Sequence, residues 1–365
     1  IYSYLTNLKR YKPIVLTTKA INREQFPFHP VYDASQITRY SWWWLRDRVG
    51  YYLYLNKKEY FEHILYFKYV LKNEKVRLIH AHFGPQGVAM IPIKKWLMLP
   101  LITTFYGYDV TQLPRENIWN NAYQRLFQEG DLFLVEGNNM KQLLMEIGCP
   151  VEKIRIQHIG IDTEKFHFKE RKPPSHGKIV ILFCGRFIEK KGLLYAIKAV
   201  NLLLSKNPHI EFRIIGDGVL RNSIASFIRE NNLNPYVRLL GYQPHHVFAE
   251  ELKKAHIYIQ PSVTAQNGDS EGGAPTTLLE AQASGIPVVS SYHADIPEAV
   301  INGKSGFLVP ERDTNALAER LEYLIAHPEE WSTMGREGRR HVEMNYNICK
   351  EADNLENIYD ALIRK

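Results

Sequence analysis

The sequence is poor in cysteine and contains no long hydrophobic run, and both absences narrow the classes of protein to which it can belong. Its 365 residues include three cysteines, Cys149, Cys184 and Cys349, which are widely spaced and odd in number. Because no Cys-x-x-Cys occurs, we expect neither a disulfide framework nor a zinc site, and a reducing compartment fits best. We also expect no signal peptide and no membrane-spanning helix, since no run reaches about 18 apolar residues.

Several motifs of common enzyme classes are also absent. No two aspartates stand two positions apart, so no Asp-x-Asp metal site for a sugar diphosphate is expected, and we predict no metal ligands. The sequence has no His-Glu-x-x-His and no Gly-x-Ser-x-Gly, which excludes the common zinc protease and serine hydrolase signatures. Gly216-Asp217-Gly218 follows an apolar run but lacks the full Gly-x-Gly-x-x-Gly pattern, so a dehydrogenase gains little support and a tight strand-to-helix turn is the simplest interpretation.

Charge is distributed unevenly along the chain. The net charge of +7 is carried entirely by the part up to Glu170, which also holds five of the six tryptophans, including Trp42, Trp43, Trp44 and Trp96. Such a mixture is compatible with a basic surface over an aromatic core or with contact to an anionic membrane surface. Nucleic acid is not an expected partner, because no nucleic-acid-binding motif accompanies the charge.

Short apolar runs alternate with amphipathic, helix-like stretches throughout the chain. This alternation predicts an α/β protein built from βαβ units with parallel sheets, and its length predicts two such domains. The polar segment 168–178 contains paired prolines and is interpreted as the linker. Residues from about His341 to Lys365 are predicted to be helical. The expected strands are Val76–Phe83, Leu101–Phe105, Leu132–Val135, Ile154–Ile159, Ile179–Cys184, Phe212–Ile215, Val237–Leu240, Ile257–Gln260, Pro287–Ser290 and Gly306–Val309.

The segment from Asp269 to Glu280 carries the strongest functional signal. Glu271 precedes two glycines and a proline, and an apolar turn then leads to Glu280. The glycines allow a ligand to approach the backbone, and the start of the following helix attracts anions. A sugar nucleotide fits such a site, with phosphate at the helix end and hydroxyls on the carboxylates. The alternative is an ordinary loop–helix–strand connection with a surface glutamate.

Polar residues follow three further predicted strands. Arg186 and Lys191 lie in the loop after Ile179–Cys184, where two cations could hold a diphosphate, although a solvated basic loop is the alternative. His82, Tyr106 and Asp109 end strands of the first half and are candidate acceptor-side groups. His80 shares a strand with His82, and we interpret it as a hydrogen-bonded core histidine.

Together these motifs resemble the family 4 retaining glycosyltransferases, which have the two-domain GT-B fold, and in particular bacterial exopolysaccharide and colanic-acid-type transferases. The resemblance covers nearly the whole chain. It implies two Rossmann-like parallel-sheet domains that face each other across a cleft, with a C-terminal helix crossing back to the first domain. The implied limits are 1–167 for the acceptor domain, 168–178 for the linker, 179–340 for the donor domain and 341–365 for the helix. The matching segments, in the family's order, are His82-Phe83-Gly84, Phe105–Asp109, His158–Asp162, Gly185-Arg186 with Lys191-Gly192, Gly216-Asp217-Gly218, Glu271 with Glu280, and Ile296-Pro297-Glu298.

The resemblance also implies roles for individual residues. Arg186 and Lys191 would bind the donor diphosphate, Glu271 would contact the transferred sugar, and Glu280 would hold the ribose hydroxyls. The nucleobase would lie near Gly241-Tyr242-Gln243. The remaining donor-binding positions would be Gly185, Gly216, Gly272, Gly273, Ala274 and Pro275.

The sequence departs from the family pattern in several places. Eight residues separate Glu271 from Glu280 where the family usually has seven, so either the loop bulges or Gly272 takes the usual glutamate place. Tyr106 stands where many members have histidine, and Ala294-Asp295 stands where Gly-Gly is common. The family's first strand and its glycine loop also have no counterpart after Ile1, so we expect the true start of the protein to lie upstream.

From the resemblance we expect a metal-independent, retaining hexosyltransferase. It would need no cofactor, and it would move a sugar from a UDP- or GDP-linked donor to a glycan or lipid-linked acceptor in surface polysaccharide biosynthesis. Of the two nucleotides, UDP is the favoured prediction. We expect it in the cytoplasm, with peripheral binding to the inner face of the membrane through the basic first half. The alternatives are a sugar-nucleotide epimerase or phosphorylase on a similar scaffold, or an inactive sugar-binding or membrane assembly protein.

Overall fold

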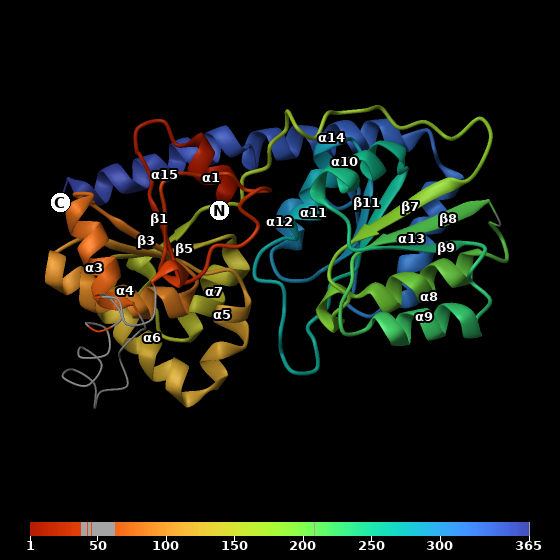
Figure 1. Cartoon of the computed structure of the whole chain (residues 1–365). Coiled ribbons are helices and arrows are strands. Elements are labelled where there is room, and N and C mark those ends of the chain that lie inside the picture. Colours follow the sequence, from red (N-terminus) through yellow and green to blue (C-terminus); the bar gives the residue numbers. More distant parts are fainter. Residues whose placement is uncertain (38–41, 43–44, 46–62, 208, 365) are drawn as a thin grey trace. The chain divides into compact units, whose positions relative to one another are not determined.

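Two compact units make up the chain in the computed structural model shown in Figure 1, which describes all residues except 38–41, 43–44, 46–62, 208 and 365. The first unit comprises Ile1–Val135, Leu143–Gln157 and Cys349–Lys365, and the second comprises Glu136–Gln142 and His158–Ile348. Trp43 and Trp44 of the tryptophan cluster lie outside the described residues. The domain limits inferred from the sequence stay a prediction.

A six-stranded parallel sheet forms the centre of the second unit. Its strands lie in the order β12-β11-β10-β7-β8-β9, and each neighbouring pair is parallel. The strands are β7 (Ile179–Cys184), β8 (Ile210–Ile215), β9 (Val237–Gly241), β10 (Ile257–Gln260), β11 (Val288–Ser291) and β12 (Gly306–Val309). All six strands were predicted from apolar runs, because strands buried on both faces are hydrophobic at nearly every position.

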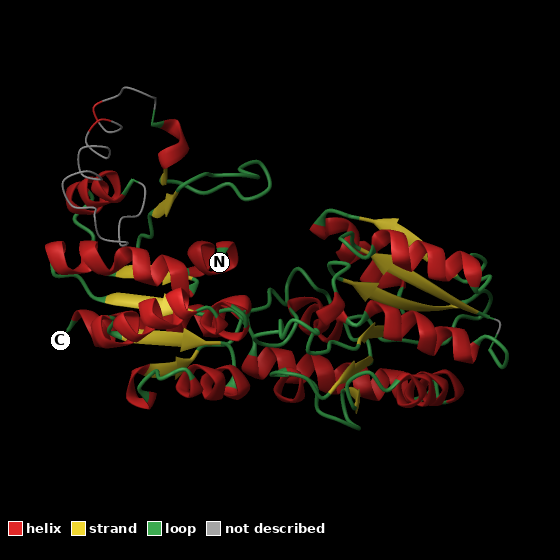
Figure 2. Ribbon diagram, turned by 90° about the horizontal axis from the view of Figure 1, so that it is seen from below, coloured by secondary structure: helices red, strands yellow, loops and turns green. Residues whose placement is uncertain are grey.

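Helices cover both faces of this sheet (Figures 1 and 2). Because successive side chains of a strand point to opposite faces, β7 contributes to a core on each side. Ile181 and Phe183 enter one core with α8, α9, α13 and the first turns of α14, whereas Val180 and Leu182 enter the other with α10, α11, α12 and the later part of α14. The helices are α8 (Leu193–Leu203), α9 (Arg221–Glu230), α10 (His245–Lys254), α11 (Thr276–Ala283), α12 (Ile296–Ala299), α13 (Thr314–Ala326) and α14 (Glu330–Asn345), with the short turn η4 (Glu189–Lys191) before α8.

The order of the strands creates a switch point beside β7. The chain passes from β7 outward to β8 and β9, then returns to the other side of β7 with β10 and continues outward through β11 and β12. Neighbouring loops after β7 and β10 therefore leave the sheet in opposite directions. In open parallel sheets, ligands bind at the carboxyl ends of the strands at such a point.

The first unit contains a four-stranded parallel sheet in the order β3-β4-β5-β6. Its strands are β3 (Ile79–His82), β4 (Leu101–Thr104), β5 (Leu132–Val135) and β6 (Ile154–Ile156). A separate parallel pair, β1 (Val15–Thr17) and β2 (Val31–Asp33), was not predicted. The other elements are α1 (Tyr2–Asn7), η1 (Ala34–Gln36), α3 (Ile64–Asn73), α4 (Gly84–Leu97), α5 (Tyr108–Thr111), η2 (Leu113–Arg115), α6 (Asn117–Glu129), α7 (Asn138–Glu146), whose first residues belong to the second unit, and η3 (Val151–Lys153).

The C-terminal stretch differs from the single helical stretch predicted over residues 341–365. Helix α14 ends at Asn345, and a new helix, α15 (Ile348–Ile363), begins after a break at which Asn347 pairs with Ile161. Within the first unit, Leu355 and Tyr359 of α15 pack on Ile102, Leu132 and Leu134 of the sheet. The apolar pattern continues through the break, so no local signal marks its position.

A buried carboxylate attaches the start of the chain to α15. Glu356 is 1% exposed and accepts hydrogen bonds from the backbone N–H groups of Lys9 and Arg10 at 2.8 and 2.5 Å. The side chain of Arg10 also contacts Glu356 at 3.1 Å and pairs with Asp360. Burial works against ionisation of Glu356, but these donors hold its pKa below the usual value. Among the described residues, no helix has both the length and the apolar character needed to cross a bilayer.

Gly192 offers a test of how closely the loops after β7 and β10 pack. Its φ is +67°, and a Cβ atom placed there would lie 1.7 Å from the carbonyl oxygen of Pro261. Gly192→Ala should lower the free energy of unfolding by at least ~3 kcal/mol, for two reasons. The alanine must adopt a left-handed conformation, and the backbone at Pro261 must move to make room for its Cβ atom. Urea unfolding followed by tryptophan fluorescence, to which the buried Trp331 of the same unit contributes, would measure this loss.

Gly303 supplies the matched control. Its φ is +75°, but a Cβ atom placed there would have no other atom within 4 Å. Gly303→Ala should therefore cost only the left-handed conformation, roughly 1 kcal/mol. Equal losses for the two variants would show that the contact between the loops is not tight.

Candidate functional site

Three predicted donor-binding glycines meet at one edge of the second unit's sheet. Gly185 and Gly216 follow β7 and β8, and Gly241 is the last residue of β9. The N–H of Gly185 donates to the carbonyl of Ile215 at 3.0 Å, and the N–H of Gly216 donates to the carbonyl of Gly241 at 2.9 Å. The carboxyl ends of the three strands are thus tied together, as parallel strands require.

A buried ion pair joins the loops after β7 and β10. The ammonium of Lys191 lies 2.8 Å from Oε1 and 2.9 Å from Oε2 of Glu271, and the two side chains are 15% and 8% exposed. Burial disfavours the charged carboxylate, but the charge and hydrogen bond of Lys191, with further help from Lys190 and Ser262, hold the pKa of Glu271 below its usual value. Glu271 is therefore an anion inside the protein, and it depends on Lys191 for compensation.

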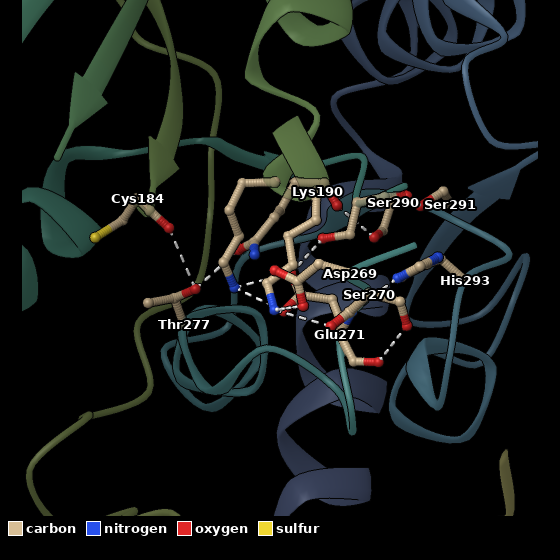
Figure 3. A network of polar contacts seen from close by, with 12 residues as sticks. Cys184, Lys190, Asp269, Ser270, Glu271, Thr277, Ser290, Ser291 and His293 are labelled. Atoms are coloured by element: carbon tan, nitrogen blue, oxygen red, sulfur yellow. Dashed lines mark hydrogen bonds and ion pairs between the residues drawn. The ribbon is translucent and has the colours of Figure 1, made fainter. Parts of the chain in front are cut away.

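A second set of contacts fixes the backbone of Glu271 (Figure 3). Its N–H donates to Nε2 of His293 at 3.1 Å, while Nδ1 of the same ring lies 2.6 Å from Oε1 of Glu311. Because Nε2 accepts a hydrogen bond, the proton of the neutral ring must sit on Nδ1, where it is donated to Glu311. Ser262 adds a hydrogen bond to Oε1 of Glu271 at 2.8 Å. Glu271 is thus held through both its main chain and its side chain.

Lys190, next to Lys191, braces the same loops. It is 6% exposed, and its ammonium contacts Oδ1 of Asp269 at 2.9 Å and the carbonyl of Ser270 at 2.8 Å. Its own carbonyl accepts a hydrogen bond from the N–H of Val263 at 2.9 Å. The two consecutive lysines therefore both hold the loop after β10, one through Asp269 and the other through Glu271.

The predicted glycine-rich loop leads into α11 as expected. After Gly272, Gly273, Ala274 and Pro275, the helix begins at Thr276. The loop passes so close to Glu136 that a Cβ atom on Gly273 would lie 1.9 Å from a carboxylate oxygen. Thr277, in the first turn, donates to Oε1 of the fully buried Gln260 at 2.8 Å. These contacts fix the start of α11 against the end of β10.

Glu280 lies inside α11 and is 7% exposed. Its Oε1 lies 2.9 Å from Nε2 of His245, the first residue of α10. Its Oε2 is buried and has no hydrogen-bond partner in the described part of the chain. One oxygen of this carboxylate is therefore engaged and the other is not.

Arg186 contrasts with Lys191 in the same loop. It is exposed, and its guanidinium makes no hydrogen bond or ion pair with any residue that the structure describes. The structure thus joins Lys191 to Glu271, while Arg186 remains a solvated cation near the carboxyl end of β7. This combination can accept an anionic ligand without first losing a protein partner.

In the first unit, the predicted histidines form a hydrogen-bonded group. His80 lies 2.7 Å from the hydroxyl of Tyr359 and 2.6 Å from that of Thr104, which confirms the prediction of a hydrogen-bonded core histidine. Burial lowers its pKa to about 3. His82 stacks on His80 and lies 2.5 Å from the hydroxyl of Tyr106. Burial, and to a smaller extent His80, hold the pKa of His82 well below its usual value, so both rings are neutral near pH 7.

Asp109 is fully buried and faces the backbone. Its carboxylate accepts hydrogen bonds from the N–H groups of Gly84, Tyr106 and Gly107 at 2.9, 2.9 and 3.0 Å. Burial raises the pKa of Asp109, although these backbone donors act in the opposite direction. The side chain thus braces the loops after β3 and β4, which places Tyr106 and leaves Asp109 itself little capacity for an acceptor.

Sequence reasoning missed several residues that shape the site. Lys190 stands next to a predicted cation, but nothing in the pattern separates a brace from a ligand-binding group. Ser262 follows a predicted strand by two residues and His293 follows one by three, which is where such a signal could have been sought. Their partners lie too far along the chain for a local pattern to reveal them. In the described part of the chain, no cluster of three or more histidine, cysteine or acidic side chains is arranged to hold a metal ion.

Comparison with known families and proteins gives this geometry a context. The family model for glycosyl transferases group 1 matches residues 163–341, and the model for glycosyltransferase family 4 matches residues 32–165. A protein of Escherichia coli named as a colanic acid biosynthesis glycosyltransferase is 36% identical over 270 residues, which is 73% of this chain and 66% of the relative. The amylovoran biosynthesis glycosyltransferase of Erwinia amylovora is 35% identical over 269 residues, with the same coverage of 73% and 66%.

The fold is also shared with a solved structure. The Anabaena protein HepE, solved in complex with UDP-glucose, superposes with a TM-score of 0.77 and 15% identity, covering 99% of this chain and 94% of that one. This chain spans about two thirds of the length of the two curated relatives above. The two family models follow one another over residues 32–341, and together with the parallel sheets of both units they show that the chain belongs to the GT-B glycosyltransferases of family 4.

Proposed function

We propose that the chain is a metal-independent, retaining hexosyltransferase that moves a sugar from a nucleoside-diphosphate donor to a glycan or lipid-linked acceptor in surface polysaccharide biosynthesis. The observation that carries this proposal is the buried pair of Lys191 and Glu271 beside the unpartnered Arg186, at the switch point of the second unit's sheet. Two cations close to a glycine-rich helix start suit a diphosphate. The names of the two curated relatives support the polysaccharide assignment.

The donor would bind with its charge against these residues. The ammonium of Lys191 has three N–H donors, so it can hold Glu271 and still donate to a phosphate oxygen. Arg186 would contact the diphosphate with its planar guanidinium, and Glu271 with the amides of Gly272 and Gly273 would contact the transferred sugar. UDP-glucose in HepE supports UDP as the nucleotide, although GDP fits the same charges.

The chemical step would then need no protein nucleophile. The bond between the anomeric carbon and the diphosphate oxygen breaks, and the departing negative charge is neutralised by Arg186, Lys191 and the first amides of α11. The acceptor hydroxyl attacks from the face that the diphosphate leaves, and its proton passes to the departing phosphate oxygen. The product keeps the anomeric configuration, which the proton NMR spectrum of a purified product would show. Tyr106, placed by His82 and Asp109, is the acceptor-side group that can donate a hydrogen bond.

A panel of sugar nucleotides tests the proposed function. A donor that binds only the folded protein at about 100 times its Kd adds roughly 2.7 kcal/mol of stability. At least one UDP- or GDP-sugar should therefore raise the melting temperature by roughly 5 °C or more. Differential scanning fluorimetry without added metal would measure the shift. If no sugar nucleotide raises the melting temperature at millimolar concentration, the assignment as a glycosyltransferase fails.

Arg186 should be required for turnover and dispensable for folding. Arg186→Ala should reduce the release of nucleoside diphosphate from the donor found in the panel by roughly 100-fold or more, because one charge stabiliser of the leaving group is lost. Its melting temperature without ligand should stay unchanged, since the side chain has no partner to lose among the described residues. Arg229→Ala removes another exposed arginine, in the last turn of α9, and should leave both quantities as they are. Near-normal turnover of Arg186→Ala would remove this residue from the mechanism.

We also propose that the first unit rests on an anionic membrane surface, where it would meet a lipid-linked acceptor at the inner face. Support comes from exposed aromatic and apolar side chains on α3 and at the end of α4, with Tyr69, Trp96 and Met98 exposed by 48%, 42% and 90%. The ammonium of Lys68 lies 4.5 Å from the ring centroid of Trp96, which brings a cation from α3 to this patch on α4. Aromatic rings beside lysines are typical of interfacial contacts.

Flotation with lipid vesicles tests the membrane proposal. The protein should float with vesicles containing about one third anionic lipid at low salt, and binding should weaken at high salt because part of the attraction is electrostatic. The double variant Trp96→Ala, Met98→Ala should float several-fold less. Met344→Ala changes an apolar side chain of the second unit that is 60% exposed and should float like the wild type. Equal flotation of both variants, or no binding by the wild type, would contradict the proposal.

A further inference from the structure

Glu280 holds one unsatisfied oxygen inside the second unit. The residue is 7% exposed, and Oε2 is buried with no hydrogen-bond partner among the residues that the structure describes. Buried acceptors are nearly always paired, so an unpaired carboxylate oxygen next to a binding loop indicates a missing donor. Hydroxyl groups of a ligand are suitable donors for it.

His245 determines which oxygen is left without a partner. Its ring lies between Lys165 and Glu280, with Nδ1 2.7 Å from the ammonium of Lys165 and Nε2 2.9 Å from Oε1 of Glu280. An ammonium can only donate, so Nδ1 must be the acceptor, and the ring proton must lie on Nε2. The imidazole therefore donates from Nε2 to Oε1 of Glu280, and Oε2 is left without this donor.

Packing holds the imidazole in this orientation. The ring meets Phe166 edge-on with centroids 5.5 Å apart and lies 6.2 Å from the ring of Phe248. Both phenylalanines are buried, so the ring is confined from two sides while its edge reaches Glu280. His245 stands at the first position of α10, and Glu280 lies in α11 (Figure 1). The contact thus couples the orientation of the carboxylate to the placement of a second helix.

We propose that His245 is a positioning residue for donor recognition, which holds Oε1 of Glu280 so that Oε2 accepts a hydrogen bond from a ribose hydroxyl. This inference rests on the proposed function, since it takes the ligand to be a nucleoside diphosphate. The side chain of His245 is 41% exposed, so water can replace its ring beside Oε1 of Glu280 in a variant, and the fold should lose little stability. Loss of the His245 side chain is therefore expected to weaken recognition of the ribose hydroxyls rather than to destabilise the fold.

A cycle of protein and ligand changes isolates this role. Isothermal titration calorimetry would measure binding of UDP and GDP, and of the 2′,3′-dideoxy form of whichever binds, to the wild type and three variants. His245→Ala should weaken binding of the ribonucleotide about tenfold, the size of one lost hydrogen bond to a charged group. The same variant should bind the dideoxy nucleotide as the wild type does, within about twofold, because that ligand has no hydroxyl for Glu280 to accept.

Two further variants separate positioning from a general disturbance. His245→Gln retains an N–H donor toward Oε1 and should restore most of the preference for the ribonucleotide. His246→Ala changes the adjacent, exposed histidine and should behave like the wild type. The melting temperatures of all three variants should lie close to that of the wild type.

Each other outcome overturns a defined part of the account. If His245→Ala weakens both nucleotides equally, or weakens neither, His245 does not position Glu280 for the ribose, and the proposed function stands without it. If the wild type binds UDP or GDP with the same affinity as the dideoxy form, Glu280 does not accept a hydrogen bond from a ribose hydroxyl. If the wild type binds neither diphosphate, the proposed function and this inference both fail.

Discussion

The ion pair between Lys191 and Glu271 is the constraint on which the rest of the site depends. The buried carboxylate of Glu271, which is 6% exposed, is stabilised as an anion by the ammonium of Lys191, which comes from the loop after a different strand. The two loops can meet because β7 and β10 are neighbours at the switch point of the sheet. Strand order thus brings the two charges together, and their mutual dependence keeps the loops in place.

The surrounding contacts divide the site into a fixed part and a part that is free to bind. Lys190 and His293 both hold the peptide group that joins Ser270 to Glu271, Lys190 through its carbonyl oxygen and His293 through its N–H. Arg186 and Oε2 of Glu280 have no partner among the described residues. An unpaired cation and an unpaired carboxylate oxygen in one unit match a ligand that carries phosphates at one end and hydroxyls at the other.

Strong local patterns were predictable from the sequence, and contacts between distant residues were not. The strands Ile179–Cys184, Ile257–Gln260 and Gly306–Val309 were predicted to the residue, because helices cover both faces of this parallel sheet and its strands are apolar at nearly every position. Strands β1 and β2 have three residues each, too few to show a period. The break between α14 and α15 depends on the pairing of Asn347 with Ile161, and the contact of His245 with Glu280 joins residues 35 positions apart. Such pairings follow from tertiary packing, which no local window contains. Arg186, Lys191, Glu271 and Glu280 were identified because they follow strands or enter a helix beside glycines, although their roles rest on the family resemblance.

The most direct test of the central claim is a crystal structure of the protein with bound UDP, or with GDP if only that nucleotide binds. The account predicts that the diphosphate contacts Arg186 and Lys191 while Lys191 keeps its contact with Glu271, and that a ribose hydroxyl lies about 3 Å from Oε2 of Glu280. A nucleotide bound at another place on the chain, or a diphosphate held without either cation, would contradict it.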